Sequence, residues 1–154
     1  MNDRMKGKKR MVYRIALFLH VLSAVVATGP LFAIFSMLKR MEKVEGALEQ
    51  GMIEGLRGAV RAVSLAGHFI VPTGIILLLF GGWSWNTSWV LITVIMLVAS
   101  LLFLAKAFKP AWHLAEATDF DKQLFIRTMR SATIKYILIM MAMLWFMIAK
   151  PQLW

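Results

Sequence analysis

The sequence predicts an all-α fold: an integral membrane protein built as an antiparallel four-helix bundle. Apolar residues make up 60% of the 154-residue chain, against about 45–50% in a typical soluble domain. They are concentrated in four long stretches, each able to cross a bilayer as a helix. Lysine and arginine gather in the tail and in the links, as membrane topology signals do. We therefore expect a basic tail over residues 1–10 and one transmembrane domain over residues 11–151.

The first apolar stretch predicts a helix over residues 12–38. His20 lies well inside it, and an imidazole within a membrane helix indicates a functional site by default. Gly29 and Pro30 fall in the same stretch, where proline removes one backbone hydrogen bond. We expect the helix to kink or loosen locally at that point.

Residues 39–61 follow with alternating charge. Their apolar positions recur at spacings of three and four: Met41, Val44, Leu48, Met52, Ile53 and Leu56. This spacing predicts an amphipathic helix on the membrane surface, weakened by three glycines.

Three further helices are predicted, over residues 62–85, 89–108 and 131–149. The uncharged aromatic link GGWSWNTSW joins the first two of them, so they form a hairpin. The polar connection after Pro110 is expected to be partly helical. An even number of helices places both termini and the aromatic link at one membrane face.

The basic residues leave the orientation of the bundle open. The face with the termini holds seven of them: Arg4, Lys6, Lys8, Lys9, Arg10, Arg14 and Lys150. The opposite face holds the other eleven of the 18, which favours that face in the cytoplasm. The basic tail argues against this orientation. If translation started at Met11, however, the face with the termini would hold two basic residues against eleven at the opposite face. An interfacial tryptophan belt is predicted near the face with the termini: Trp83, Trp85, Trp89, Trp145 and Trp154.

The composition excludes or disfavours several kinds of chemistry. The chain has no cysteine, so it has no disulfide and no thiolate metal site. The four predicted spans contain no Asp or Glu, which argues against a proton-coupled transporter. We predict no catalytic residue, because no nucleophile–base set, phosphate loop or carboxylate pair is visible. We also expect no nucleic-acid partner, because no basic–aromatic module is present, while enzymatic activity stays an open question.

Two histidines lie in the predicted spans, and their depths differ. At a rise of 1.5 Å per residue, His20 lies about 12 Å below the face with the termini, and His68 lies about 9 Å below the opposite face. In a hydrocarbon slab about 30 Å thick, the two imidazoles differ in depth by about 9 Å. One haem bound by both imidazoles would require His20 and His68 to lie at nearly equal depths. Haem binding by this pair therefore stays an open alternative but is not favoured. Tyr136 matches His68 in depth, and its hydroxyl would satisfy that imidazole.

A set of methionines matches His20 better. They lie about 9–14 Å below the face with the termini by the same rise: Met96, Met140, Met141 and Met143. Imidazole with thioether is a known haem ligand pair, and the same soft ligands suit Cu(I). The alternative is plain packing, because methionine fills irregular gaps. Candidate cofactor ligands are therefore His20, His68, Met96, Met140 and Met143, with His20 as the candidate metal ligand.

His20 shares its helix face with small or apolar residues: Ser23, Ala24, Ala27 and Leu31. Small residues mark close helix approach, so we expect His20 to face the bundle interior. There it either binds a cofactor or forms a hydrogen bond across the bundle. For His68 the hydrogen-bonding role is favoured.

The segments LHVLSAVVATGP and FIVPTGIILLLFGGWSW resemble the first two helices of the CopD-like membrane superfamily. That superfamily includes the copper-resistance protein CopD and the HemJ-type protoporphyrinogen oxidases. The ending MLWFMIAKPQLW most resembles a branch of small predicted integral membrane proteins of unknown function. By this resemblance His20 corresponds to the first-helix histidine, which is associated with haem b in HemJ-type proteins. Pro72 and Gly74 correspond to the proline region of the second helix.

Together these observations predict an inner (cytoplasmic) membrane protein that binds haem b through His20. Its role would lie in haem handling, electron transfer or respiratory-chain assembly. The alternative is a cofactor-free membrane interaction or assembly protein, while copper handling and transport rank lower. The expected partners are the lipid bilayer and respiratory-chain or other membrane proteins, with a homo-oligomer left open.

Overall fold

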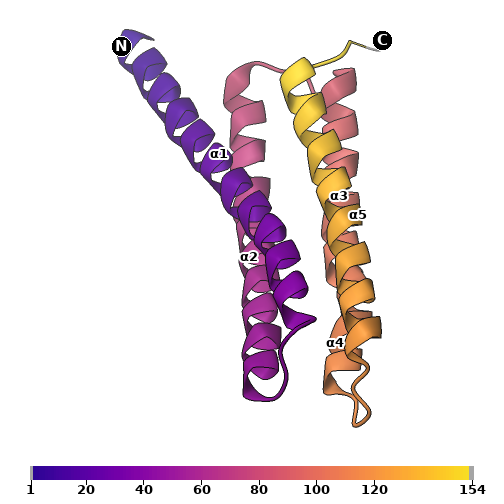
Figure 1. Cartoon of the computed structure of the whole chain (residues 1–154). Helices are drawn as coiled ribbons and strands as arrows, with labels where there is room; N and C mark the ends of the chain where they lie inside the picture. The colour runs from indigo at the N-terminus through magenta and orange to yellow at the C-terminus, as the bar shows by residue number, and fades with distance from the viewer. Residues whose placement is uncertain (1, 153–154) are drawn as a thin grey trace.

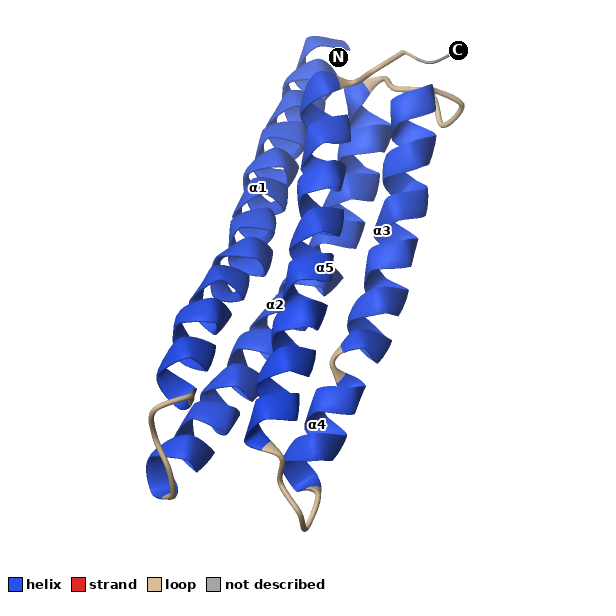
Figure 2. Ribbon diagram, turned by 45° about the vertical axis from the view of Figure 1, so that its right-hand side comes forward, coloured by secondary structure: helices blue, strands red, loops and turns tan. Residues whose placement is uncertain are grey.

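The computed structural model describes residues 2–152, with side chains from residue 7 onward, as five helices without strands. Four helices are long: α1 (Asn2–Met41), α2 (Ala47–Gly81), α3 (Ser88–Ala107) and α5 (Lys122–Ala149). The short α4 (Lys109–Glu116) continues below α3 (Figure 2). Successive long helices run in opposite directions, and the chain begins and ends at the same end of the bundle (Figure 1). The predicted antiparallel four-helix bundle is confirmed.

The four long helices are long and apolar enough to cross a membrane. Many large apolar side chains lie on the outside of the bundle, such as Phe18 at 66% exposure and Ile148 at 74%. In water such a surface would drive aggregation, whereas in a bilayer it contacts lipid at no cost. The chain is therefore a multi-pass membrane protein.

The long helices form two packed pairs. α1 packs chiefly on α2, to which it runs at an angle, and α3 packs on α5 (Figure 1). Contacts between α1 and α5 join the two pairs. The buried stripe of α1 repeats at spacings of three and four through Ala27, Leu31, Ile34, Leu38 and Met41, as expected for one face of a helix.

The helices extend further than the predicted spans. α2 begins at Ala47, fifteen residues before the predicted start at residue 62, so residues 47–61 belong to the second long helix instead of forming a separate surface segment. Likewise α5 begins at Lys122, nine residues before the predicted start at residue 131, and the basic tail is helical from Asn2. α1 also continues through Gly29 and Pro30 without ending there. The 35 residues of α2 measure about 52 Å, well beyond a hydrocarbon slab of about 30 Å.

The end of the bundle away from the termini, which we call the charged end, is made of residues 38–61 and 103–135. It has its own fully buried apolar centre, with Leu38, Met41, Leu56, Ala111 and Phe125 at 0% exposure. Three ion pairs surround that centre: Arg57–Glu116 at 3.0 Å, Lys122–Glu49 at 2.9 Å and Arg130–Glu42 at 3.1 Å. The charged residues therefore cap the bundle as a packed extension of the same helices.

The opposite end carries most of the predicted tryptophan belt. α2 ends at Gly81, and Gly82 turns the chain in a left-handed conformation with φ 73°, which glycine adopts without strain. The rings of Trp83 and Trp89 meet edge to face at 5.2 Å, and Lys150 Nζ lies 4.7 Å from the centre of the first ring. α2 and α3 run in opposite directions and are joined by the short link 82–87, which confirms the predicted hairpin (Figure 1). Trp154 lies outside the described residues.

Candidate functional site

His20 lies on the buried face of α1, as predicted. Its exposed fraction is 7%, and Ala16, one turn before it, and Ala27, two turns after it, are also buried. The small side chains of this face let α2 approach α1 closely, and His20 is the polar residue that α1 contributes to the described contact.

His20 is held to α2 through one ring nitrogen. Its Nδ1 lies 3.2 Å from the carbonyl oxygen of Ile70 and 3.0 Å from Oγ1 of Thr73. A carbonyl oxygen only accepts hydrogen bonds, so Nδ1 carries the proton and donates it. The Thr73 hydroxyl in turn donates to the carbonyl oxygen of Phe69 at 2.6 Å, which leaves its oxygen free to accept from Nδ1. This bonding assigns the tautomer with an unprotonated Nε2.

The second ring nitrogen, Nε2, forms no hydrogen bond among the described residues. The one fully enclosed side-chain polar atom without a partner in that part of the chain is Nε1 of Trp89. Nε2 of His20 therefore keeps a small exposed area, within a residue that is 7% exposed as a whole.

Gly74 completes the surroundings of the imidazole. A Cβ atom at this position would lie 3.3 Å from Cε1 and 3.7 Å from Nδ1 of His20. Contacts at 3.3 Å are tighter than most Cβ atoms tolerate, so glycine gives the ring room beside α2. Thr73 and Gly74 thus set the position of His20 from across the helix pair.

The structure does not bring His68 to His20. His68 is exposed on the outer side of α2, and its Nδ1 donates to the carbonyl oxygen of Ser64 one turn earlier at 2.8 Å. His68 and Ile70 are two residues apart, so they project from nearly opposite sides of the helix. Among the described residues no hydrogen bond joins His68 to Tyr136 as expected; His68 bonds Ser64, and the ring of Tyr136 stacks on that of Phe103 with centroids 6.3 Å apart.

The candidate methionines lie in the apolar core. Met140 and Met143 are 3% and 5% exposed on the buried face of α5, and Met96 of α3 is half-buried against the same cluster. That cluster also contains Ile70, whose carbonyl oxygen bonds His20, and Ala27, which lies two turns after His20 on α1. The polar contacts of His20 are made to α2, and none of them involves a methionine.

The chemistry of this site is that of a single neutral imidazole in an apolar setting. The described residues contain no group of three or more histidine, cysteine or acidic side chains that could hold a metal ion. A haem needs fewer protein ligands, because its macrocycle supplies four of the six ligands of the iron and one histidine suffices in several haem proteins. With Nδ1 held by Ile70 and Thr73, Nε2 is the atom of His20 that would bind such an iron.

Sequence reasoning identified His20 but missed its partners. Thr73, Ile70 and Gly74 come from the second long helix, and their contact with His20 depends on the vertical register of α1 against α2. One signal was available: a threonine and a glycine directly follow Pro72 within an otherwise apolar stretch. The comparison of this chain with protein-family models, with characterised proteins and with solved structures finds no match.

Proposed function

We propose that this protein binds haem b through Nε2 of His20 and acts in haem handling, electron transfer or respiratory-chain assembly. The proposal places it in the inner (cytoplasmic) membrane, as its resemblance to the CopD-like superfamily implies. Haem b would supply one-electron redox chemistry between its ferric and ferrous states.

The observation that carries the proposal is the way His20 is anchored. Histidines that bind metals almost always donate their other ring N–H to a carbonyl, carboxylate or water, which fixes the tautomer and orients the ring. Nδ1 of His20 makes this kind of contact with Ile70 and Thr73. The contact also raises the basicity of Nε2 and so strengthens it as a ligand. An intramembrane histidine arranged in this way is suited to binding iron.

The proposed roles of the other residues follow from their positions. Thr73 and Ile70 orient the imidazole, and Gly74 leaves space beside it. Met140, Met143 and Met96 would be the candidates to hold the haem together with His20, since thioether sulfur pairs with imidazole in known haem sites. His68 is assigned no ligand role because it lies on the outer side of α2.

The direct test is optical spectroscopy of variants purified in mild detergent from haem-replete cells. We expect the wild-type protein to show a Soret band and sharp α and β bands after reduction with dithionite. His20→Ala removes the ligand, so we expect these bands to be lost.

His68→Ala is the matched control, because it removes the other intramembrane histidine at an exposed position. We expect it to retain the spectrum of the wild-type protein. A His20→Ala protein that keeps all its haem, with the same thermal stability as the wild type, would refute ligation by His20.

A cofactor-free membrane assembly protein is the second candidate. It is favoured by the observation that the hydrogen bonds from His20 to Ile70 and Thr73 already satisfy one nitrogen and join α1 to α2. On this alternative the wild type has no haem spectrum and no copper, and cross-linking in membranes captures one defined partner. A haem spectrum that depends on His20 would exclude it.

A further inference from the structure

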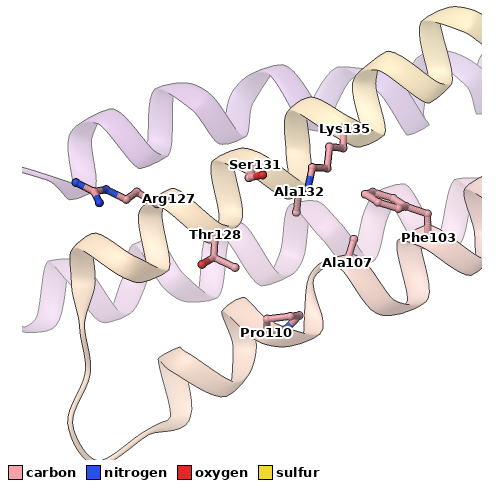
Figure 3. Close-up of a pocket in the computed structure, with 8 residues that line it drawn as sticks. All are labelled: Phe103, Ala107, Pro110, Arg127, Thr128, Ser131, Ala132 and Lys135. Atoms are coloured by element: carbon pink, nitrogen blue, oxygen red, sulfur yellow. The ribbon is translucent and has the colours of Figure 1, made fainter.

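A second candidate site lies at the charged end, on the side of the bundle formed by α3, α4 and α5. A cavity of about 420 Å³ opens there, lined by Phe103 and Ala107 of α3 and by Arg127, Thr128, Ser131 and Lys135 of α5. Figure 3 shows Thr128 and Ala132 facing Pro110 and Ala107 across this space. A second hollow of about 300 Å³ shares Arg127, Ser131 and Lys135. The first cavity lies between α3, α4 and α5, and we call it the groove; the second hollow lies on the face of α5 alone.

The two cations of this groove have no anionic partner within the described chain. The three ion pairs found among the described residues use Arg57, Lys122 and Arg130. Neither Arg127 nor Lys135 takes part in an ion pair there. The groove therefore carries two uncompensated positive charges.

Two hydroxyl groups in the groove are also unused. On the same two helices, Thr93, Ser100 and Thr133 donate to a carbonyl oxygen of the preceding turn. Thr128 and Ser131 form no such bond among the described residues. Their hydroxyls are consequently free to donate to a ligand.

The depth of the groove places it at the boundary of the bilayer. The 20 residues of α3 measure about 30 Å, the thickness of the hydrocarbon core, so that core ends near Ala107. Arg127 and Lys135 are eight residues apart, or about 12 Å along α5. Arg127 then lies at headgroup level, and Lys135 lies at the hydrocarbon edge, where an ammonium group needs a counter-charge.

We propose that this groove binds the headgroup of an anionic phospholipid from the leaflet at the charged end. Arg127 and Lys135 neutralise the phosphate, and Thr128 and Ser131 donate to its oxygens. Phe103 and Ala107 contact the first carbons of the acyl chains. Basic pockets between transmembrane helices recognise anionic lipids by this combination of charge and apolar surface. The inference concerns the other end of the bundle from His20 and does not depend on haem.

The test is native mass spectrometry of the full-length protein in mild detergent, titrated with phosphatidylglycerol. Phosphatidylcholine of the same acyl chains serves as the zwitterionic comparison. We expect the wild type to retain phosphatidylglycerol in preference to phosphatidylcholine. Each cation near an anionic surface contributes about 1 kcal/mol, so Arg127→Gln with Lys135→Gln should weaken retention about thirtyfold.

Two further variants separate the site from general charge and from misfolding. Lys39→Gln with Lys43→Gln removes the same charge at the same end but outside the groove, and we expect it to retain phosphatidylglycerol. Arg127→Lys with Lys135→Arg keeps both charges and should also retain it. Equal losses in the groove and control variants would overturn the proposal.

The last experiment uses inorganic phosphate as a competitor, because it has the phosphate chemistry of the headgroup without the acyl chains. We expect it not to displace phosphatidylglycerol at equal concentration. If phosphate alone competes as well as the lipid, the groove is an ion site and the lipid proposal fails.

Discussion

The hydrogen bonds of His20 are the polar link between α1 and α2. Nδ1 shares its proton between the Ile70 carbonyl oxygen and the Thr73 hydroxyl, at 3.2 and 3.0 Å. In hydrocarbon a polar group has no water to replace a lost partner, so this link favours one register of the two helices. The same link leaves Nε2 as the unprotonated nitrogen of the ring.

Removing one of these acceptors should weaken the bundle measurably. Thr73→Val keeps the shape of the side chain and leaves Nδ1 with Ile70 alone, so we expect the free energy of unfolding to fall by about 0.5–1.5 kcal/mol. Thr93→Val is the control, because its hydroxyl bonds its own helix at Trp89, and it should change stability by less than about 0.5 kcal/mol. Thermal unfolding in detergent compares the two. Equal effects would show that the His20–Thr73 bond adds nothing.

For single residues, the sequence predicted that His20 faces the bundle interior, but it did not predict which side chains surround it. The small residues around His20 correctly indicated an inward-facing imidazole, now buried with Ala27 and Leu31. Its partners could not be predicted, because depth estimates carry errors of several residues while a hydrogen bond requires a match within one. The depth difference between His20 and His68 was informative, but the side of the helix on which His68 lies proved more decisive.

Among the helices, α5 shows most clearly what determines where an element begins. Asp121 precedes it and accepts a hydrogen bond from the backbone N–H of Leu124 at 2.9 Å. This is an N-cap, which satisfies one of the open N–H groups of the first turn. Lys122 then reaches Glu49 of α2 and the carbonyl oxygen of Val44, so the capped turn is fixed to the other helix pair.

Loss of this cap should loosen the start of α5. Asp121→Ala is expected to reduce the free energy of unfolding by about 0.5–2 kcal/mol. Amide hydrogen exchange should become faster over residues 122–125 and stay unchanged near residue 140. Asp119→Ala, two residues earlier in the exposed turn, should change stability by less than about 0.5 kcal/mol. Unchanged exchange in Asp121→Ala would refute the capping role.

The starts of α2 and α5 differ from the predicted starts of the apolar spans for the same reason. Hydropathy marks where a chain leaves hydrocarbon, whereas a helix ends only where its backbone hydrogen bonds end. α2 and α5 therefore start fifteen and nine residues earlier than the apolar spans. The signals for these starts were Gly46, which turns the chain with φ 66°, and the capping residue Asp121.

In the whole molecule, the burial of side chains changes along the axis of the membrane bundle. Fully buried residues such as Leu38, Leu56 and Phe125 gather toward the charged end, while His20 lies toward the end with the termini. The number of long helices, their directions and the hairpin followed from the sequence, because apolar length and the aromatic link determine them. The pairing of α1 with α2 and α3 with α5 required the structure.

This division of the bundle gives each end a separate proposed task. The charged end is held by ion pairs and a buried apolar centre, and its groove is proposed to hold a lipid headgroup. The half containing His20 is proposed to hold haem. The two proposals rest on different residues, so the variants that test one should leave the other unchanged.

The most direct test of haem binding is the haem content of the wild-type protein. A pyridine haemochrome assay on protein purified from haem-replete cells, with the chain quantified by amino-acid analysis, gives the number of haems per chain. Ligation by the single inward-facing histidine predicts about one haem b per chain. Protein that contains no haem, and takes up none when haem is added to the folded bundle, would contradict the account and leave His20 as a link between two helices.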